Sequence, residues 1–344
     1  MALWGRIVDI RSALARTVAR ESLSEAEMEA VMRQLMEGAA TPAQIGALLV
    51  ALRMKGETVD EITGAVRAMR AFAARVHPRA AVVVDTCGTG GDQRGTFNIS
   101  TAAALIAAGA GLSVAKHGNR AMSGRVGGAD VLEALGVKID LAPERVAACL
   151  DEVGLAFFFA QLFHPAMRHA AGPRRELGLR TIFNLLGPLS NPAGARYQIV
   201  GVFAPEWTEP LARALGRLGS VHALVVHGED GLDEISLAAP TQISEWKNGT
   251  LHAYRITPEE FGFERCRDGD LDGGDRDTAA SVIRGIIAGA TGPRLDIAVL
   301  NAAAAIYVGG FVPSIHAGID LARDSIRSGR ASQKLAQLIE FTNR

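Results

Sequence analysis

The sequence predicts an α/β protein in which a small N-terminal all-helical domain precedes a larger domain with a mainly parallel sheet flanked by helices. Three capped amphipathic helices fit within the first 75 residues, and short apolar runs then alternate with helical stretches. The 344 residues suffice for two hydrophobic cores. We therefore expect a helical domain at residues 1–76, joined by helices from about residues 165–190, and an α/β domain at residues 77–344.

Each of the three N-terminal helices begins at its own cap. Residues 24–27 (Ser-Glu-Ala-Glu) form a capping box, and residues 41–44 (Thr-Pro-Ala-Gln) repeat it with proline at the first helical position. Residues 58–61 (Thr-Val-Asp-Glu) open the third helix. Apolar residues follow each cap at helical spacing, which predicts one buried face per helix. An earlier helix over residues 10–19 is expected to join this unit.

After His77-Pro78 the pattern changes to strands that alternate with helices. The expected strands are 81–85, 112–115, 156–160, 197–203 and 222–227, and the expected helices between them are 101–110, 129–135, 143–153 and 208–218. This alternation is typical of a parallel sheet that is covered on both faces. Asn248-Gly249 predicts an antiparallel hairpin between 241–246 and 250–255, and the chain is mostly helical from Arg276 onward.

Composition excludes several classes of protein. The formal net charge is −1, so no global field attracts nucleic acid or an anionic membrane. Cys87, Cys149 and Cys266 are odd in number and widely spaced, which excludes a disulfide scaffold and any C-x-x-C metal site. No run of eighteen apolar residues occurs. We expect a cytoplasmic protein with no membrane partner and no nucleic-acid partner.

The glycine-rich loop at residues 85–92 (Asp-Thr-Cys-Gly-Thr-Gly-Gly-Asp) lies between a predicted strand and a predicted helix. Glycines let the backbone approach an anion closely, and unpaired N–H groups at a helix start point at it. Ser100 and Thr101 add hydroxyls at the expected helix cap. The order of residues fits neither the P-loop nor the dinucleotide fingerprint. The loop predicts a phosphate or pyrophosphate site, against the alternative of a glycine-rich turn without a ligand.

A second glycine-rich loop, residues 116–130, follows the next predicted strand. It carries three cations, His117, Asn119 and four glycines. Loops at the carboxyl ends of neighbouring parallel strands meet at one edge of the sheet. Lys116 offers a compact charge for a phosphate, whereas a solvated basic loop is the alternative interpretation.

Two further segments carry charged candidates. Asp233 and Glu234 suit Mg²⁺ if a turn brings both carboxylates together, which Gly231 permits. Otherwise this pair is ordinary surface charge. In residues 173–184, one arginine is able to hold a carboxylate bidentately, against the alternative of arginines on a solvated helix surface.

These motifs together resemble the anthranilate phosphoribosyltransferase family over essentially the full chain. The resemblance is carried by residues 41–45, GTGGD at 88–92, 98–101, KHGNR at 116–120, 128–136, RTIFNLLGPLSNP at 180–192, and the pair 233–234. It implies a nucleoside phosphorylase-like fold, a homodimer assembled through the helical domain, and a place in tryptophan biosynthesis. The implied reaction transfers the phosphoribosyl group of 5-phosphoribosyl 1-pyrophosphate to the amine of anthranilate and releases pyrophosphate.

The resemblance also implies site residues. Those implied to surround phosphoribosyl pyrophosphate are Gly88, Gly91, Asp92, Thr96, Asn98, Ile99, Ser100, Thr101, Lys116, His117, Gly118, Asn119, Arg120, Ala121, Met122, Ser123, Gly124 and Gly128. Those implied to meet anthranilate are Gly88, His117, Asn119 and Arg174. Two Mg²⁺ ions are implied, one held by Ser100 and Glu234 and the other by Asp233 and Glu234. No residue is implied as a general acid or base.

The sequence departs from the family's pattern at a few positions. Gly124, Val126 and Gly128 stand where many members have serines, and backbone N–H groups are able to replace such hydroxyls. Gly172-Pro173 precedes Arg174 where the family has Pro-Val.

Two rival functions remain open at this point. A pyrimidine nucleoside phosphorylase shares a related lysine-and-glycine loop, and thymidine phosphorolysis would distinguish it. A non-catalytic paralogue that binds nucleic acid is the other, and it predicts a basic face that a net charge of −1 does not favour.

Overall fold

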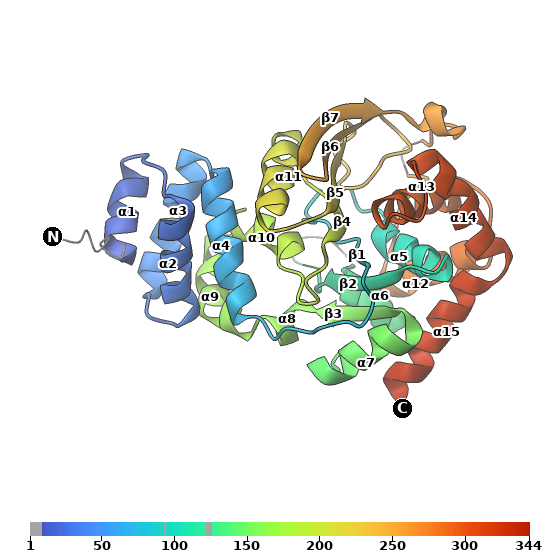
Figure 1. Ribbon diagram of the computed structural model, residues 1–344, viewed down its shortest axis with the longest axis horizontal. Coiled ribbons are helices and arrows are strands. Elements are labelled where there is room, and N and C mark those ends of the chain that lie inside the picture. Colours follow the sequence, from blue (N-terminus) through green and yellow to red (C-terminus); the bar gives the residue numbers. More distant parts are fainter. Residues whose placement is uncertain (1–8, 93, 122–125, 268) are drawn as a thin grey trace.

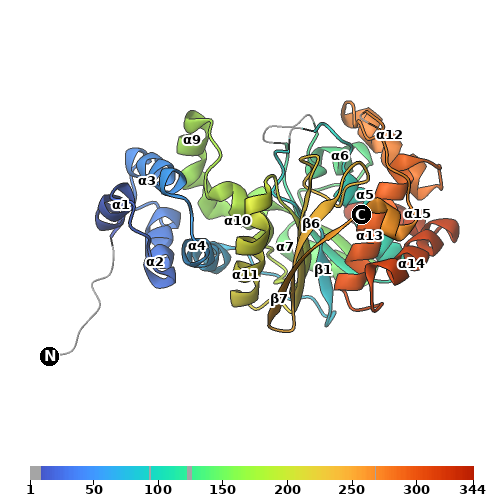
Figure 2. The same ribbon diagram turned by 90° about the horizontal axis from the view of Figure 1, so that it is seen from above.

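The computed structural model describes residues 9–92, 94–121, 126–267 and 269–344. A helical unit at one end of the molecule meets a larger part in which helices surround a single sheet (Figures 1 and 2). Helix α1 (Ile10–Val18) lies at the helical end, and the C-terminus is at the end of α15 (Arg330–Asn343), on the side of the larger part. This is the predicted fold class.

The helical unit begins with α1 (Ile10–Val18), α2 (Glu25–Met36), α3 (Pro42–Lys55) and α4 (Val59–Phe72). The expected capping boxes form at the starts of α2, α3 and α4. Later in the chain, α9 (Arg168–Leu177) and α10 (Phe183–Leu189) pack into the same hydrophobic core. They share this core with α2, α3 and α4, while the domain division itself, 1–76 with helices from about 165–190 and then 77–344, stays a prediction.

The sheet has seven strands in the order β3-β2-β1-β4-β5-β6-β7. Its parallel members are β1 (Val83–Asp85), β2 (Ser113–Gly118), β3 (Leu155–Phe159), β4 (Tyr197–Gly201) and β5 (His222–Gly228). The hairpin of β6 (Thr241–Lys247) and β7 (Thr250–Ile256) extends one edge in antiparallel pairing. Asn248 and Gly249 both have positive φ, 50° and 86°, as the predicted two-residue turn requires.

Alternate residues along the central strands enter different cores. Ile199 and Leu224 belong to the core beneath the C-terminal helices, whereas Val200 and Ala223 belong to the core shared with the helical unit. Because successive side chains of a strand point to opposite faces, both faces of the sheet are covered. The sheet is therefore buried between two helical layers, as the strand sequences predicted.

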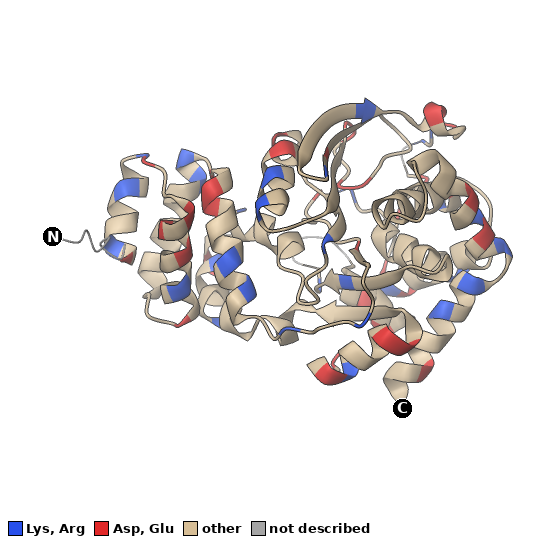
Figure 3. Ribbon diagram, viewed as in Figure 1, with Lys and Arg blue, Asp and Glu red and all other residues tan. Residues whose placement is uncertain are grey.

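The remaining helices form those layers and the connections. In chain order they are α5 (Ile99–Gly109), α6 (Gly128–Ala134), α7 (Pro143–Val153), α8 (Ala160–Phe163), α11 (Thr208–Arg217), α12 (Arg276–Ile287), α13 (Pro293–Val308), α14 (Ile315–Arg327) and α15 (Arg330–Asn343). Single 3-10 turns occur at Pro165–Met167, Pro205–Trp207 and Pro258–Phe261. Lys and Arg are interspersed with Asp and Glu along the helices (Figure 3).

Some predicted boundaries need correction. The strand expected at 112–115 continues to Gly118, because Lys116, His117 and Gly118 pair with Phe157, Phe158 and Phe159 of β3. Lys116 and His117 are thus strand residues rather than loop residues. Helix α5 begins at Ile99, two residues before the expected start, with Asn98 as its N-cap. No helix within the described residues has the length and apolar character needed to span a membrane.

Candidate functional site

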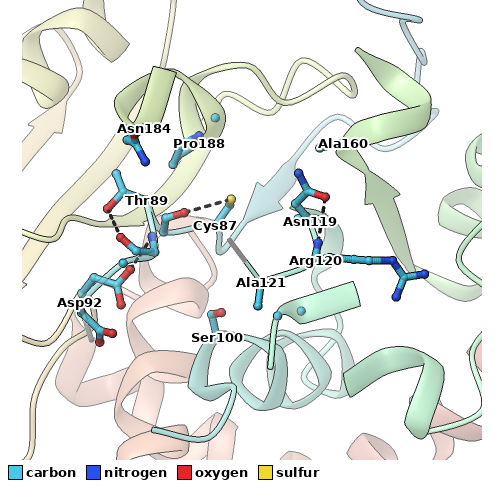
Figure 4. A pocket seen from close by; sticks show the side chains of 18 of the residues that line it. Cys87, Thr89, Asp92, Ser100, Asn119, Arg120, Ala121, Ala160, Asn184 and Pro188 are labelled. Carbon is cyan, nitrogen blue, oxygen red and sulfur yellow. Dashed lines mark hydrogen bonds between the residues drawn. The ribbon is translucent and has the colours of Figure 1, made fainter. Parts of the chain in front are cut away.

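A cavity of about 1010 Å³ opens at the carboxyl ends of β1 and β2, facing α9 and α10 (Figure 4). Carboxyl ends of parallel strands are where α/β sheets bind ligands. Every described residue that the sequence proposed for the phosphoribosyl pyrophosphate, anthranilate or metal sites lines this cavity, except Thr101. Thr101 is 1% exposed in the first turn of α5. Met122, Ser123 and Gly124 lie outside the described residues.

The glycine loop after β1 is anchored by the end of β4 and by the carboxylate of Asp233. Thr89 N donates to Gly201 O at 2.8 Å, and Phe203 N donates to Thr89 Oγ1 at 3.1 Å. Gly90 N donates to Asp233 Oδ2 at 2.8 Å. A Cβ at Gly88 would lie 2.9 Å from the same carboxylate oxygen, so a larger residue there would displace the Asp233 side chain.

The start of α5 points its amides toward this loop system. Asn98 makes no capping bond with its side chain, and its Nδ2 instead donates to Val126 O at 3.1 Å. Ser100 N donates to Glu234 Oε1 at 3.1 Å, so an anionic side chain already occupies part of the helix N-terminus. The neighbouring amides of Ile99 and Thr101 donate to Phe97 O and Asn98 O, so this turn offers an anion the positive end of the helix dipole rather than free N–H groups.

Lys116 reaches the cavity from β2 while remaining 5% exposed. Its Nζ donates to Ser100 Oγ at 3.0 Å and to Thr86 O at 3.3 Å. These bonds hold a buried ammonium between the glycine loop and α5, where its charge faces the place an anion would occupy.

Three carboxylates converge on the other side of the glycine loop. Gly231, with φ of 91°, supplies the turn that brings Asp233 and Glu234 into one cavity with Asp92. Burial, followed by repulsion from Asp92 and Glu234, raises the pKa of Asp233 well above its usual range. Burial also raises the pKa of Glu234, against the attraction of Lys116. Together these acids gather negative charge that a divalent cation would neutralise.

Two neutral imidazoles line the cavity beneath α10. The ring centroids of His117 and His164 lie 5.2 Å apart. Burial lowers the pKa of His117 to about 3 and that of His164 to about 4, so both rings are uncharged at pH 7. His117 Nδ1 lies 3.1 Å from Gly187 O, which assigns the ring proton to Nδ1. Nε2 of His117 is then a free acceptor among the described residues.

Asp85 supports this region from below. Its Oδ1 accepts from His117 N at 3.1 Å, and its Oδ2 accepts from Asn191 Nδ2 at 2.8 Å. Ligand atoms of Asp85, Cys87 and His117 lie within 4.8 Å of one another, but a thiol and an imidazole are not ligands that Mg²⁺ prefers. Burial also raises the pKa of the Cys87 thiol. The oxygen-rich set at Asp233 and Glu234 is the better magnesium candidate.

Arg174 and Arg175 of α9 both line the cavity from the helical unit, and Arg174 is the more buried of the two. Its guanidinium carbon lies 5.0 Å from the centroid of the Phe183 ring, and burial lowers its pKa. Within the described part of the chain, no carboxylate makes an ion pair with it. Arg175, the neighbour on the helix, is exposed. Arg174 is therefore a partly buried cation that lacks an anionic partner, as a site for a carboxylate substrate requires.

The segment after β2 holds its position through side chains that point away from the cavity. Arg120 donates to both oxygens of Glu133 and to Asp130, and Figure 4 shows it extending away from Ser100. Asp130 also accepts from Gly127 N at 2.9 Å and Ala121 N at 3.2 Å. The guanidinium of Arg120 is thus engaged by acids, so its backbone is the part that remains for a ligand.

Several cavity residues escaped the sequence interpretation. His164, Asn184 and Arg180 line the cavity, although none lies in a glycine loop. Arg180 and Asn184 lie within the segments 173–184 and 180–192, but the sequence interpretation gave neither of them a role. Arg174 and Arg180 flank Gly178 and come from one short stretch, so the density of arginines there was the signal available.

Comparison with known proteins covers nearly the whole chain. The helical bundle domain of a glycosyl transferase family matches residues 11–73, and the a/b domain of a glycosyl transferase family matches residues 80–332. An anthranilate phosphoribosyltransferase of Thioalkalivibrio sulfidiphilus is 55% identical over 335 residues, which are 97% of this chain and 99% of that protein.

Solved structures agree with this match. Anthranilate phosphoribosyltransferase from Thermus thermophilus is 46% identical with a TM-score of 0.92, covering 96% of this chain and 99% of that one. The enzyme of the same name from Saccharomyces cerevisiae, in complex with PRPP and Mg, is 26% identical with a TM-score of 0.88. That comparison covers 97% of this chain and 98% of the yeast chain.

Proposed function

The chain belongs to the anthranilate phosphoribosyltransferase family, and we propose that its cavity transfers the phosphoribosyl group of phosphoribosyl pyrophosphate to anthranilate in tryptophan biosynthesis. A single observation carries the assignment within this chain. An anion-binding loop system, an acidic cluster and an unpaired arginine meet in one cavity, where the reaction needs a pyrophosphate, a metal and a carboxylate. Neither rival function is favoured by the relatives, which share the transferase name.

The phosphoribosyl pyrophosphate would lie over the glycine loop and the start of α5. Backbone amides of the loop, Lys116 and the first turn of α5 supply donors and positive potential for its phosphates. Gly128 closes the far side of this region, near Lys116. The loop residues 122–124 belong to this proposal from the sequence alone.

The residues present fit Mg²⁺. Asp233 and Glu234 lie next to the glycine loop through the contacts of Gly90 N and Ser100 N, and the crowding of their charges with Asp92 calls for a cation. We propose two ions per subunit, one at Ser100 and Glu234 and one at Asp233 and Glu234. Bound there, Mg²⁺ neutralises the negative charge that develops on departing pyrophosphate.

Anthranilate would lie between the helical unit and the glycine loop. Arg174 would receive its carboxylate, Asn119 and Gly88 would border it, and the uncharged ring of His117 would face its aromatic amine. An aromatic amine is neutral at pH 7, so its lone pair needs no base to free it. The two neutral imidazoles exclude water without placing a competing cation near the ribose.

The protein contributes positioning and electrostatics to the reaction. The bond from C1′ to the pyrophosphate oxygen breaks while the amine nitrogen bonds to C1′, and positive charge develops on the ribose. Lys116 and the dipole of α5 stabilise the pyrophosphate, and Arg174 aligns the amine for attack. The proton that the new C–N bond makes acidic passes to pyrophosphate, the strongest base in the site.

Assembly and location belong to the same proposal. Val18 on α1 and Met54 on α3 are each 68% exposed, and these helices pack side by side in the helical unit. Large exposed apolar side chains on adjacent helices favour a homodimer through this unit. We also propose a cytoplasmic location, in keeping with Cys87 and Cys149, which form no disulfide bond.

Anthranilate fluorescence tests the proposal. Purified protein is incubated with anthranilate, phosphoribosyl pyrophosphate and Mg²⁺, and each component is omitted in turn. Loss of fluorescence that requires all of them supports the transferase. Persistent fluorescence from folded protein, with cleavage of thymidine by phosphate, would support the phosphorylase instead.

A further inference from the structure

The turn at Gly90 and Gly91 is held from two sides of the cavity. On the side of the sheet, Thr89 is fixed by the end of β4 and Gly90 N by Asp233. On the opposite side, Arg180 Nη2 donates to Gly91 O. Arg180 belongs to the connection between α9 and α10, so this contact links the helical unit to the glycine loop.

Arg180 is well placed to hold this carbonyl. Its guanidinium carbon lies 4.5 Å from the centroid of the Phe203 ring. A Cβ at Gly91 would lie 3.6 Å from Arg180 Nη2 and 3.7 Å from Nε, so the guanidinium lies against the Gly91 backbone. Contact with an aromatic ring and a charge-assisted bond together fix the orientation of the guanidinium.

The glycine loop needs such a restraint. Gly90 and Gly91 have φ of 66° and 81°, and successive glycines lose more backbone entropy than other residues when they become ordered. The peptide between Gly91 and Asp92 is planar and trans, so its C=O and N–H point in opposite directions. Holding Gly91 O against Arg180 therefore fixes the direction of the Asp92 N–H.

We propose that Arg180 is a positioning residue that holds the Gly90-Gly91 turn in the conformation that receives pyrophosphate. The inference rests on the proposed function, because it takes the glycine loop as part of the pyrophosphate site. Arg180 acts through the Gly91 peptide rather than on the reacting atoms. The same hydrogen bond connects the glycine loop to the chain just after α9, the helix that carries Arg174.

The test compares Arg180→Gln and Arg180→Lys with Arg168→Gln, a change at an exposed arginine of α9 that does not line the cavity. Calorimetric titration with pyrophosphate in excess Mg²⁺ measures binding without turnover. Steady-state assays then give kcat and both KM values. Circular dichroism and thermal melts show whether each variant is folded.

Arg180→Gln should weaken pyrophosphate binding about tenfold, which corresponds to about 1.4 kcal/mol. The KM for phosphoribosyl pyrophosphate should rise with it, while the KM for anthranilate changes less than about twofold. The pyrophosphate affinity of Arg180→Lys should lie between those of Arg180→Gln and the unaltered protein. The lysine ammonium is able to reach the carbonyl of Gly91 but lacks the planar contact with Phe203. Lysine also provides the test if the glutamine variant does not fold.

Unchanged pyrophosphate binding in a folded Arg180→Gln protein would overturn the inference. So would an equal loss in Arg168→Gln, or a fall in kcat with both KM values unchanged, which marks a merely structural role. Because calorimetry needs no turnover, an unaltered protein that binds pyrophosphate but leaves anthranilate intact would refute the proposed function alone.

Discussion

Replacing Arg174 with glutamine tests the least usual electrostatic feature of the cavity. The guanidinium is partly buried against Phe183, its pKa is lowered by that burial, and no described acid pairs with it. A cation in this position carries a desolvation cost that an anionic ligand would offset. If that ligand is the carboxylate of anthranilate, the variant should lose affinity for anthranilate specifically.

The magnitude follows from the kind of contact. Hydrogen bonds to charged groups contribute about 1.5–3 kcal/mol each, and a bidentate pair that is partly open to solvent should give about 2–3 kcal/mol in total. Since 1.4 kcal/mol is a factor of ten, kcat/KM for anthranilate should fall about 30- to 150-fold. The KM for phosphoribosyl pyrophosphate should change little, because Arg174 lies on the helical side of the cavity.

The assay is the initial rate of anthranilate fluorescence loss at saturating phosphoribosyl pyrophosphate. Arg168→Gln is the matched control, because this arginine also lies on α9, is exposed and does not line the cavity. An unchanged kcat/KM for anthranilate in Arg174→Gln, or an equal fall in Arg168→Gln, would refute this role for Arg174. An equal loss of affinity for both substrates in the Arg174 variant would also refute it.

Three further predictions follow from the geometry. Changing Asp233→Asn and Glu234→Gln together should reduce kcat/KM by at least about a hundredfold and remove the dependence of the rate on Mg²⁺. The melting temperature of the metal-free protein should rise, because the double variant lacks the repulsion between buried carboxylates. Retained activity at saturating Mg²⁺ would contradict the metal assignment. Gly88→Ala should lower activity, because the added Cβ displaces the Asp233 carboxylate. Gly46→Ala on α3 is the control, since its added Cβ would meet no atom within 4 Å and should leave activity unchanged. Equal activities of the two variants would count against a close contact between Gly88 and Asp233. Glu245 lies outside the cavity. Burial alone would raise the pKa of its carboxyl, but hydrogen bonds from three side chains outweigh burial and lower this pKa to about 2. Because this pKa is lowered on folding, Glu245 stabilises the fold at pH values above the pKa of the carboxyl in the unfolded chain, and that stabilisation is lost as the pH falls. Urea titrations should therefore show that Glu245→Gln lowers the free energy of unfolding by about 2 kcal/mol at pH 7 and by less at pH 3. A cost that does not change with pH would refute this.

Local signals made much of the fold predictable. The capping boxes of α2, α3 and α4 and the Asn248-Gly249 turn depend on residues a few positions apart, so the sequence contains their whole cause. Strand ends were harder to predict. Whether Lys116 belongs to β2 depends on the three phenylalanines of β3, about forty residues later.

The residues of the site also differ in how far the sequence could predict them. Glycine loops after strands are visible in the sequence, and the convergence of Asp233 and Glu234 was foreseen as a condition on the turn at Gly231. His164 was missed and Arg180 was given no role of its own, because both lie in short connections beside α8, α9 and α10 whose place in the cavity depends on tertiary packing. Such contacts between distant elements leave no short motif.

The central claim is that this cavity couples pyrophosphate release to the consumption of anthranilate. Parallel measurement of pyrophosphate and anthranilate in one reaction mixture with Mg²⁺ tests it most directly. The account predicts one pyrophosphate released for each anthranilate consumed, and negligible release when anthranilate is omitted. Pyrophosphate release at an unchanged rate without anthranilate, or anthranilate loss without pyrophosphate, would contradict it.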